Sequence, residues 1–173
     1  MFSNEMIKKR DSLMFVIITD FCKQNTDRKI MVWSANFHVA HDLNQVTYSS
    51  DTSFYNFMIP LGQHLKQEYG DKVYNIAFTH PNHIKYSNLN DTVKNTMEYY
   101  LYNQFTADIS FVDFEKIRKN EFYVNKIFPS YLLYGGRDIH FGKWFHLFDG
   151  VFFIRNHQAS TIQGKTWQEL QEY

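Results

Sequence analysis

The sequence predicts an α/β fold of three layers, in which helices cover both faces of a mostly parallel β-sheet. Four short runs rich in β-branched and aromatic residues indicate strands, and they lie at residues 29–33, 73–78, 109–113 and 151–154. Stretches with helical periodicity stand between several of these runs, an alternation that is typical of parallel strands with helices on the sheet faces. With 173 residues, the chain is long enough for one domain with a core of its own.

The first part of the chain predicts a helix and then a strand. Apolar residues recur at three- and four-residue intervals over about residues 4–24, which is the pattern of an amphipathic helix. The turn-forming residues 25–27 end this helix. The apolar run Lys29–Trp33 is predicted as a buried strand, and the small and polar residues 34–41 that follow it are predicted as a loop.

The central part alternates in the same way. Residues 42–56 are polar and predict a long loop. A helix is expected between Pro60 and Gly70, because proline suits the first turn of a helix and glycine its end. The strand 73–78 comes next, followed by the loop 80–83.

The last part is less regular. Asp91 is a suitable N-cap for a helix that extends to Phe105. The elements expected beyond it are a strand at 109–113, a short helix at 114–119, an irregular stretch at 120–147, a strand at 151–154 and a polar tail from residue 158.

Composition excludes several classes of protein. Hydrophobic residues make up 44% of the chain, which favours a globular domain over a disordered segment. Lys plus Arg equals Asp plus Glu at 18 each, and this balance argues against a nucleic-acid partner. No apolar run approaches membrane-spanning length or has the features of a signal peptide, so we expect a soluble cytoplasmic protein without a membrane partner.

Four motifs in consistent order carry a resemblance to a known family. Residues 29–40, Lys-Ile-Met-Val-Trp-Ser-Ala-Asn-Phe-His-Val-Ala, resemble the Trp-Ala-His-Asn-x-His strand and loop of the erythromycin esterase-like family. Residues 10–14 resemble its Arg-Asp-x-x-Met helix, residues 61–74 its Gly-x-x-Leu helix with the following strand, and residues 148–154 its closing Phe-Asp-Gly strand. The match is to the C-terminal part of the family's domain, so residues 1–173 are expected to form that portion and the sheet to be incomplete on its N-terminal side.

The resemblance implies a hydrolase. Members of the family hydrolyse the lactone ester of macrolides such as erythromycin with a histidine that activates water, and they need no metal or cofactor. That base lies in the family's N-terminal half, so we expect a truncated or degenerate hydrolase, inactive as an isolated chain, whose substrate is a macrolide-like or other ester. Self-association or pairing with an N-terminal half is expected. The alternative is a non-catalytic binding or interaction domain that retains the scaffold.

Four residues are candidates for the site. His38 is the catalytic candidate because it follows a predicted strand and an imidazole can exchange protons near neutral pH; a histidine satisfied by neighbouring backbone is the structural alternative. Asn36 and Trp33 are candidates for substrate binding, and Glu98 is expected at the edge of the site unless it lies on the solvated side of its helix. Ala35 stands where the family's motif has its first histidine, which would weaken or abolish activity.

Two histidine pairs with metal-ligand spacing are assigned no metal. His38 and His41 are three residues apart, as are His80 and His83. Both pairs fall in predicted loops without a carboxylate at a suitable spacing, so no metal is expected.

Adjacent charged residues stand in the first predicted helix. Arg10 and Asp11 are expected to point in different directions and not to pair with each other. Asp11 is instead expected to tie this helix to a loop.

Overall fold

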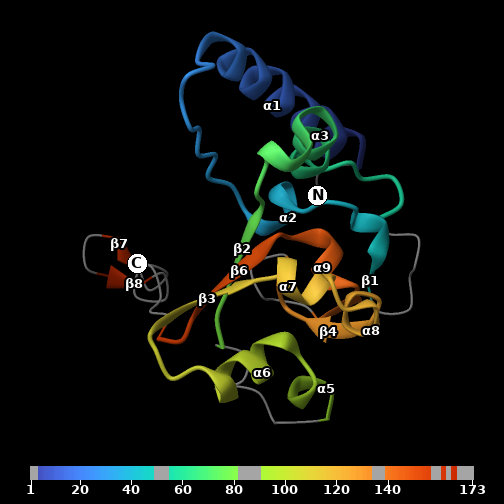
Figure 1. Cartoon of the computed structure of the whole chain (residues 1–173), viewed down its shortest axis with the longest axis vertical. Coiled ribbons are helices and arrows are strands. Elements are labelled where there is room, and N and C mark those ends of the chain that lie inside the picture. The colour runs from blue at the N-terminus through green and yellow to red at the C-terminus, as the bar shows by residue number, and fades with distance from the viewer. Residues whose placement is uncertain are drawn as a thin grey trace.

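The computed structural model describes residues 4–48, 55–81, 91–133, 139–156, 161–162 and 165–166. Their elements form the predicted α/β fold, with helices around two small sheets and a short hairpin (Figure 1). The strands are β1 (Val46–Tyr48), β2 (Ile76–Thr79), β3 (Ile109–Asp113), β4 (Phe128–Ser130), β5 (His140–Gly142), β6 (Gly150–Ile154), β7 (Thr161–Ile162) and β8 (Lys165–Thr166).

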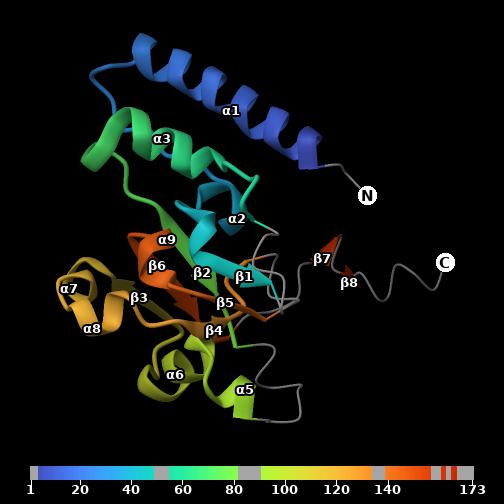
Figure 2. The same cartoon turned by 90° about the vertical axis from the view of Figure 1, so that its right-hand side faces the viewer.

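Helices occupy both ends of the molecule. The α-helices are α1 (Asn4–Gln24), α2 (Asn36–Val39), α3 (Leu61–Tyr69), α5 (Asp91–Lys94), α6 (Met97–Gln104), α7 (Glu115–Arg118), α8 (Glu121–Val124) and α9 (Trp144–Leu147), with the 3₁₀ turns η1 (Leu43–Gln45) and η2 (Gly70–Lys72). Figures 1 and 2 show α1 and α3 at one end and α5 and α6 at the other, with the sheets between them. Helix α1 is the outermost element and packs on α3.

The first of the two small sheets has the order β2-β6-β3, and its central strand β6 belongs to the Phe-Asp-Gly motif. Strands β2 and β6 are parallel, with Ile76 opposite Gly150, whereas β3 runs antiparallel to β6. The second sheet, β1-β5-β4, is antiparallel throughout. Within the described residues, parallel pairing is therefore limited to one strand pair. Strands β1, β4 and β5 have three residues each, too short to show a period, and so were predicted as loop or irregular stretch.

The predicted strand Lys29–Trp33 is wrong. This segment has no regular secondary structure and forms no ladder with another strand in the described part of the chain. Met31 and Trp33 are 88% and 78% exposed, and Ile30 and Val32 are only partly buried, so the segment is not the buried strand that was expected. A strand needs a neighbour that completes its backbone hydrogen bonds, and apolar composition alone does not supply one.

The helices that the sequence predicts at the two ends of the molecule are largely confirmed. Helices α1 and α3 have the expected limits, and Gly70 ends α3 with a φ of 55°, which a glycine adopts without strain. The helix expected from Asp91 to Phe105 is instead two short helices. Thr96 interrupts it, because its side-chain oxygen accepts the N–H of Tyr99 at 3.3 Å and so caps a new helix.

The core lies between the two sheets and the helices that flank them. Its fully buried large side chains include Tyr55, Phe114, Trp144 and Phe148. Helix α3 approaches α2 closely at Gly62, where a Cβ atom would collide with the backbone oxygen of Val39. This contact fixes α2 against α3 and so positions the residues that α2 carries.

No helix in the described ranges is both long and apolar enough to cross a membrane.

Candidate active site

His38 lies on α2, a single helical turn that follows the extended segment containing Trp33. Phe37 is buried beside it and anchors the turn in the core. The side chain of His38 is 16% exposed, so its imidazole is shielded on most sides but remains within reach of solvent. The structural alternative, a histidine satisfied by neighbouring backbone, is not what the ring contacts show, because both ring nitrogens meet side chains of α1.

Asp11 joins three elements through one buried carboxylate. Its Oδ2 accepts a hydrogen bond from His38 Nδ1 at 2.9 Å and another from the backbone N–H of Leu61 at 3.2 Å. Leu61 is the first residue of α3, so this carboxylate satisfies a free N–H at a helix start, where the helix dipole also favours negative charge. Asp11 was expected to tie its helix to a loop. It does bind the stretch 34–41 that was predicted as a loop, but its partner there, His38, lies on the helical turn α2, and its second partner, Leu61, lies on α3.

Arg10 completes the cluster. Its Nη2 lies 2.7 Å from His38 Nε2 and 3.5 Å from Nδ1. A guanidinium can only donate, so Nε2 is the acceptor, and the imidazole proton is assigned to Nδ1, which donates to Asp11. These contacts assign the His38 ring to the tautomer with its proton on Nδ1 and its lone pair on Nε2.

The expectation that Arg10 and Asp11 do not pair is wrong. Arg10 Nε lies 3.5 Å from Asp11 Oδ1. Adjacent side chains leave a helix in different directions, but the long arginine side chain bends toward His38 and so returns to the carboxylate. The result is a three-residue cluster, Arg10–His38–Asp11, built from α1 and α2.

Asn36 occupies the edge of β2. Its Nδ2 donates to the carbonyl oxygens of Phe78 at 2.6 Å and Leu132 at 2.7 Å, and its Oδ1 accepts the N–H of Phe78 at 2.9 Å. The amide therefore pairs with both backbone groups of one residue, as a neighbouring strand would. Asn36 fixes the start of α2 against the end of β2, which is a positioning role.

Glu98 lies behind this edge and not on a solvated helix face. Its side chain is on α6 and is 1% exposed. Its Oε1 accepts hydrogen bonds from Thr79 Oγ1 at 3.0 Å, Ser130 Oγ at 2.8 Å and the backbone N–H of Tyr131 at 3.2 Å. Burial raises the pKa of Glu98, although these hydrogen bonds oppose the rise. Its Oε2 is buried without a hydrogen-bond partner among the described residues.

The structure brings Asn36 and Glu98 into one network. Asn36 binds the backbone of Phe78 and Leu132, and Glu98 binds Thr79 and Tyr131, which are the adjacent residues. Trp33 contacts the same edge, since its ring centroid lies 4.9 Å from that of Phe78. These three sequence candidates therefore meet around the carboxyl end of β2, where α/β folds place their ligands.

A third buried carboxyl group, that of Asp149, lies at the opposite end of β2 and serves the fold. Asp149 accepts hydrogen bonds from the Asn75 N–H and from Arg118 Nη1, each at 2.8 Å, and Lys66 Nζ lies 3.5 Å away. Burial alone would raise the pKa of Asp149, but these donors and the nearby charges together lower it. His41 Nε2 is 3.7 Å from the same carboxylate, and burial lowers the pKa of His41 to about 4.

Sequence reasoning did not identify Arg10 as a partner of His38. The signal was present in the Arg-Asp pair of the first helix, but 28 residues separate Arg10 from His38. Only the packing of α1 and α2 around α3 reveals the pairing.

No group of three or more histidine, cysteine, aspartate or glutamate side chains is arranged to hold a metal ion in the part of the chain that the structure describes. His83 lies outside the described residues. Both nitrogens of His38 already contact Asp11 and Arg10.

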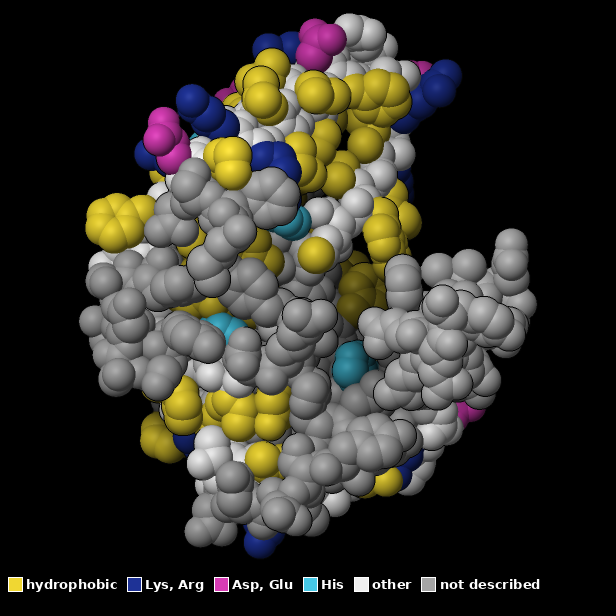
Figure 3. Space-filling view, turned by 180° about the vertical axis from the view of Figure 1, so that it is seen from behind, with side chains coloured by type: hydrophobic (Ala, Val, Ile, Leu, Met, Phe, Trp, Pro, Cys, Tyr) yellow, Lys and Arg dark blue, Asp and Glu magenta, His cyan; other side chains and the backbone are white. Residues whose placement is uncertain are grey.

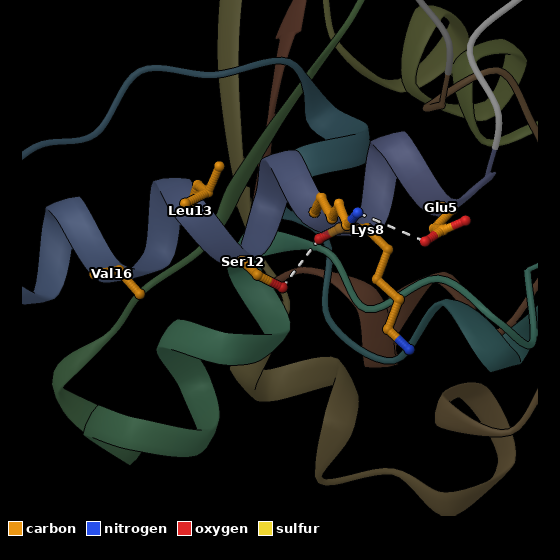
Figure 4. A pocket seen from close by; sticks show the side chains of 6 residues that line it. Glu5, Lys8, Ser12, Leu13 and Val16 are labelled. Carbon is orange, nitrogen blue, oxygen red and sulfur yellow. Dashed lines mark hydrogen bonds and ion pairs between the residues drawn. The ribbon is translucent and has the colours of Figure 1, made fainter.

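A shallow groove on the outer face of α1 is separate from this cluster (Figure 4). All of its lining residues come from that one helix: Glu5, Lys8, Lys9, Ser12, Leu13 and Val16. Leu13, Val16 and Ile17 of α1 are more than half exposed. Figure 3 shows hydrophobic side chains gathered with charged ones at this end of the molecule. The groove holds no candidate chemistry, but it marks an apolar helix face without a partner among the described residues.

Comparisons with known proteins agree with this architecture. A family model described as "Erythromycin esterase" matches residues 3–126. Among solved structures, a histidine variant of erythromycin esterase EreC in its open conformation aligns with a TM-score of 0.56 and 16% identity, over 84% of this chain and 36% of that chain. A Bacillus cereus protein aligns with a TM-score of 0.58 and 20% identity, over 88% and 39%.

A third solved structure, described as a succinoglycan biosynthesis protein, aligns with a TM-score of 0.51 and 20% identity, over 73% of this chain and 33% of that chain. No curated protein matches the sequence. At these identities the structural likeness shows the fold alone, and the chain spans between a third and two fifths of the length of the structures it matches.

Proposed function

Because the chain belongs to the erythromycin esterase family, we propose that it supplies the Arg10–His38–Asp11 cluster to a site that hydrolyses a carboxylic ester, such as a macrolide lactone. The observation that carries the proposal is the orientation of His38. Asp11 binds its Nδ1 at 2.9 Å, which leaves the lone pair on Nε2, the atom that a general base uses. Hydrolase activity, a role in the response to antibiotics and a cytoplasmic location belong to the same proposal.

The chemistry is ester hydrolysis by activated water. In this proposal His38 acts as the base, a role that the resemblance assigns to a histidine of the family's N-terminal half. A water oxygen attacks the ester carbon while Nε2 of His38 takes a proton from that water, giving a tetrahedral intermediate with a negative oxygen. The imidazolium then returns the proton to the alcohol oxygen as its bond to carbon breaks, and an acid and an alcohol leave. Asp11 stabilises the positive charge on the ring, because its carboxylate accepts a hydrogen bond from Nδ1–H throughout.

Arg10 has two positions in this scheme. Its Nη2 donates to Nε2 in the resting cluster, and that lone pair cannot accept water at the same time. Arg10 therefore has to move off His38 before the reaction. The oxyanion of the intermediate is the natural new partner of the guanidinium, since fixed donors that meet developing charge lower the barrier.

The other candidates are given supporting roles. Trp33, 78% exposed beside Phe78, is proposed as an apolar wall for the substrate. Asn36 holds the start of α2 in place. Glu98 is proposed to act through Thr79 and Tyr131 and not by touching substrate, because its side chain is buried.

A model ester tests the proposal on the chain itself. The isolated chain is expected to be inactive on a macrolide lactone, but p-nitrophenyl acetate is a far more reactive ester that a single general base can help to hydrolyse. We therefore expect the purified chain to hydrolyse it slowly above background, and His38→Ala to lower that rate about tenfold or more through the loss of one acid–base group. His80→Ala is the matched control, since His80 is also partly exposed and follows β2 directly. Equal losses in both variants, at equal melting temperatures, would show that His38 is not the base.

A second candidate function is a non-catalytic binding domain that retains the scaffold. Two observations favour it: Ala35 stands in place of the motif's first histidine, and the apolar face of α1 is exposed. The variant Ala35→His separates the two functions, because its backbone (φ −66°, ψ 151°) accepts any residue. A higher rate on the model ester supports a weakened hydrolase, whereas an unchanged rate near background supports the binding domain.

A further inference from the structure

The guanidinium of Arg10 is poorly matched to its partners. A planar guanidinium presents parallel N–H groups that fit the two oxygens of a carboxylate, and such bidentate pairs are the strong ones. In this structure its short contact, 2.7 Å, is to the neutral nitrogen His38 Nε2. The carboxylate of Asp11 is reached only through Nε, at 3.5 Å.

Asp11 is not able to improve this pairing without losing others. Its Oδ2 already accepts from His38 Nδ1 and from the N–H of Leu61. The carboxylate is 1% exposed and fixed between three helices, whereas the Arg10 side chain is 51% exposed. The arginine is therefore the exposed member of the cluster and faces solvent, from which an anion can approach.

We propose that Arg10 and His38 form a binding site for a carboxylate, the group that ester hydrolysis releases. The guanidinium turns from Nε2 to the two oxygens of the incoming carboxylate, and Nε2 is left without its donor. This inference rests on the proposed function, because the carboxylate would be the acid product of that hydrolysis. Its test measures binding and does not need turnover.

The charge of the cluster favours a single negative charge on the ligand. Arg10 is positive, Asp11 is negative and His38 is neutral in the assigned tautomer, so the three residues together carry no net charge. A monoanion gains two hydrogen bonds from the guanidinium of Arg10 and meets the least repulsion from Asp11. A phosphate dianion would meet stronger repulsion from the buried carboxylate, because repulsion grows with the product of the charges.

The experiment is a titration of the full chain, labelled with ¹⁵N-histidine, with sodium acetate at constant ionic strength set by sodium chloride. The nitrogen resonances of His38 report the loss of the Arg10 hydrogen bond directly. We expect the Nε2 resonance of His38 to shift with a saturable midpoint on the order of millimolar, as befits a ligand of few atoms. The resonances of His80 should not move.

Variants of Arg10 separate the effect of its planar guanidinium from the effect of its positive charge. Arg10→Gln should weaken acetate binding tenfold or more, and Arg10→Lys, which keeps the charge but loses the planar fork, should weaken it several-fold. Lys9→Gln is the matched control, because Lys9 is the neighbouring exposed cation and pairs with Glu5 at 3.6 Å. Its affinity should equal that of the unchanged chain.

Three results would overturn the inference: no saturable shift of His38, the same acetate affinity in Arg10→Gln, or tighter binding of phosphate than of acetate. If Arg10→Gln does not fold, Arg10→Lys and Lys9→Gln still decide between a fork and a general effect of charge. Acetate binding with no hydrolysis of the model ester would overturn the proposed function and leave this inference standing; hydrolysis without acetate binding would do the reverse.

Discussion

His38 Nδ1 and Asp11 Oδ2 lie 2.9 Å apart, although 27 residues separate them in the chain. The same carboxylate oxygen also binds the first N–H of α3, so the tautomer of the histidine and the start of a helix depend on one atom. A change at Asp11 is therefore expected to affect both stability and chemistry.

Asp11→Asn should lower the free energy of unfolding by about 1 to 2 kcal/mol, because the helix start loses a charged acceptor. The rate on p-nitrophenyl acetate should fall as well, since an amide cannot stabilise an imidazolium as a carboxylate does. Urea unfolding and initial rates measure the two effects. Asp20→Asn on the same helix is the control, because Asp20 is exposed and binds only Gln24 in the described structure; it should change stability by less than about 0.5 kcal/mol. Equal effects at both positions would contradict the role given to Asp11.

The isolated chain is expected not to open the lactone of erythromycin. The resemblance assigns further acid–base groups to a part of the family's domain that this chain does not match, and losing even one such group typically slows a reaction by about 10² to 10⁴. Mass spectrometry of erythromycin incubated with the purified chain measures ring opening. Turnover that persists through purification and disappears in His38→Ala would refute this prediction.

Self-association is expected through the outer face of α1. Leu13, Val16 and Ile17 expose most of their apolar surface there, and burial of such surface is worth about 25 cal/mol per Å². A second copy of the chain is the simplest occupant, because two copies of one apolar helix face can meet about a two-fold axis. Light scattering after size-exclusion chromatography measures the mass.

Ile17→Glu should shift the chain toward the monomer if this face is the contact. Ile127→Glu is the matched control, since Ile127 is exposed to a similar extent outside α1. A monomer in the unchanged chain at all concentrations, or equal effects of the two variants, would rule out association through α1.

His41 should make stability fall as the pH is lowered from about 6.5 to about 4, against an opposite contribution from Glu98, whose raised pKa favours the protonated folded chain. Burial lowers the pKa of His41 to about 4, against 6.5 for an ordinary histidine, so between these values the unfolded chain binds a proton that the folded chain does not. The shift corresponds to roughly 3 kcal/mol. Below that window Asp149 adds to the loss. Its pKa is lower in the folded chain than in the unfolded chain, so the unfolded chain takes up a proton first and is favoured as the pH falls further.

Urea unfolding across this pH range measures the slope. His41→Gln should flatten it. A slope that survives in His41→Gln would assign the acid sensitivity to other groups.

The sequence by itself determined the elements that depend on local pattern. The periodicity over residues 4–24 gave the limits of α1, Pro60 and Gly70 gave those of α3, and alternation gave β3. The motifs also led to the family, and they marked Asn36 and His38 before any contact was known. These features were predictable because each depends on residues close together in the chain.

Tertiary structure decided the rest. Lys29–Trp33 has the composition of a strand but no partner strand in the described structure. At the edge of β2 the side-chain amide of Asn36 forms the backbone hydrogen bonds that a neighbouring strand would have formed. Arg10 became a partner of His38 only because α3 holds α1 and α2 together. Hydrogen bonds between segments that are distant in the chain depend on how whole elements pack, and no local pattern of residues encodes that packing.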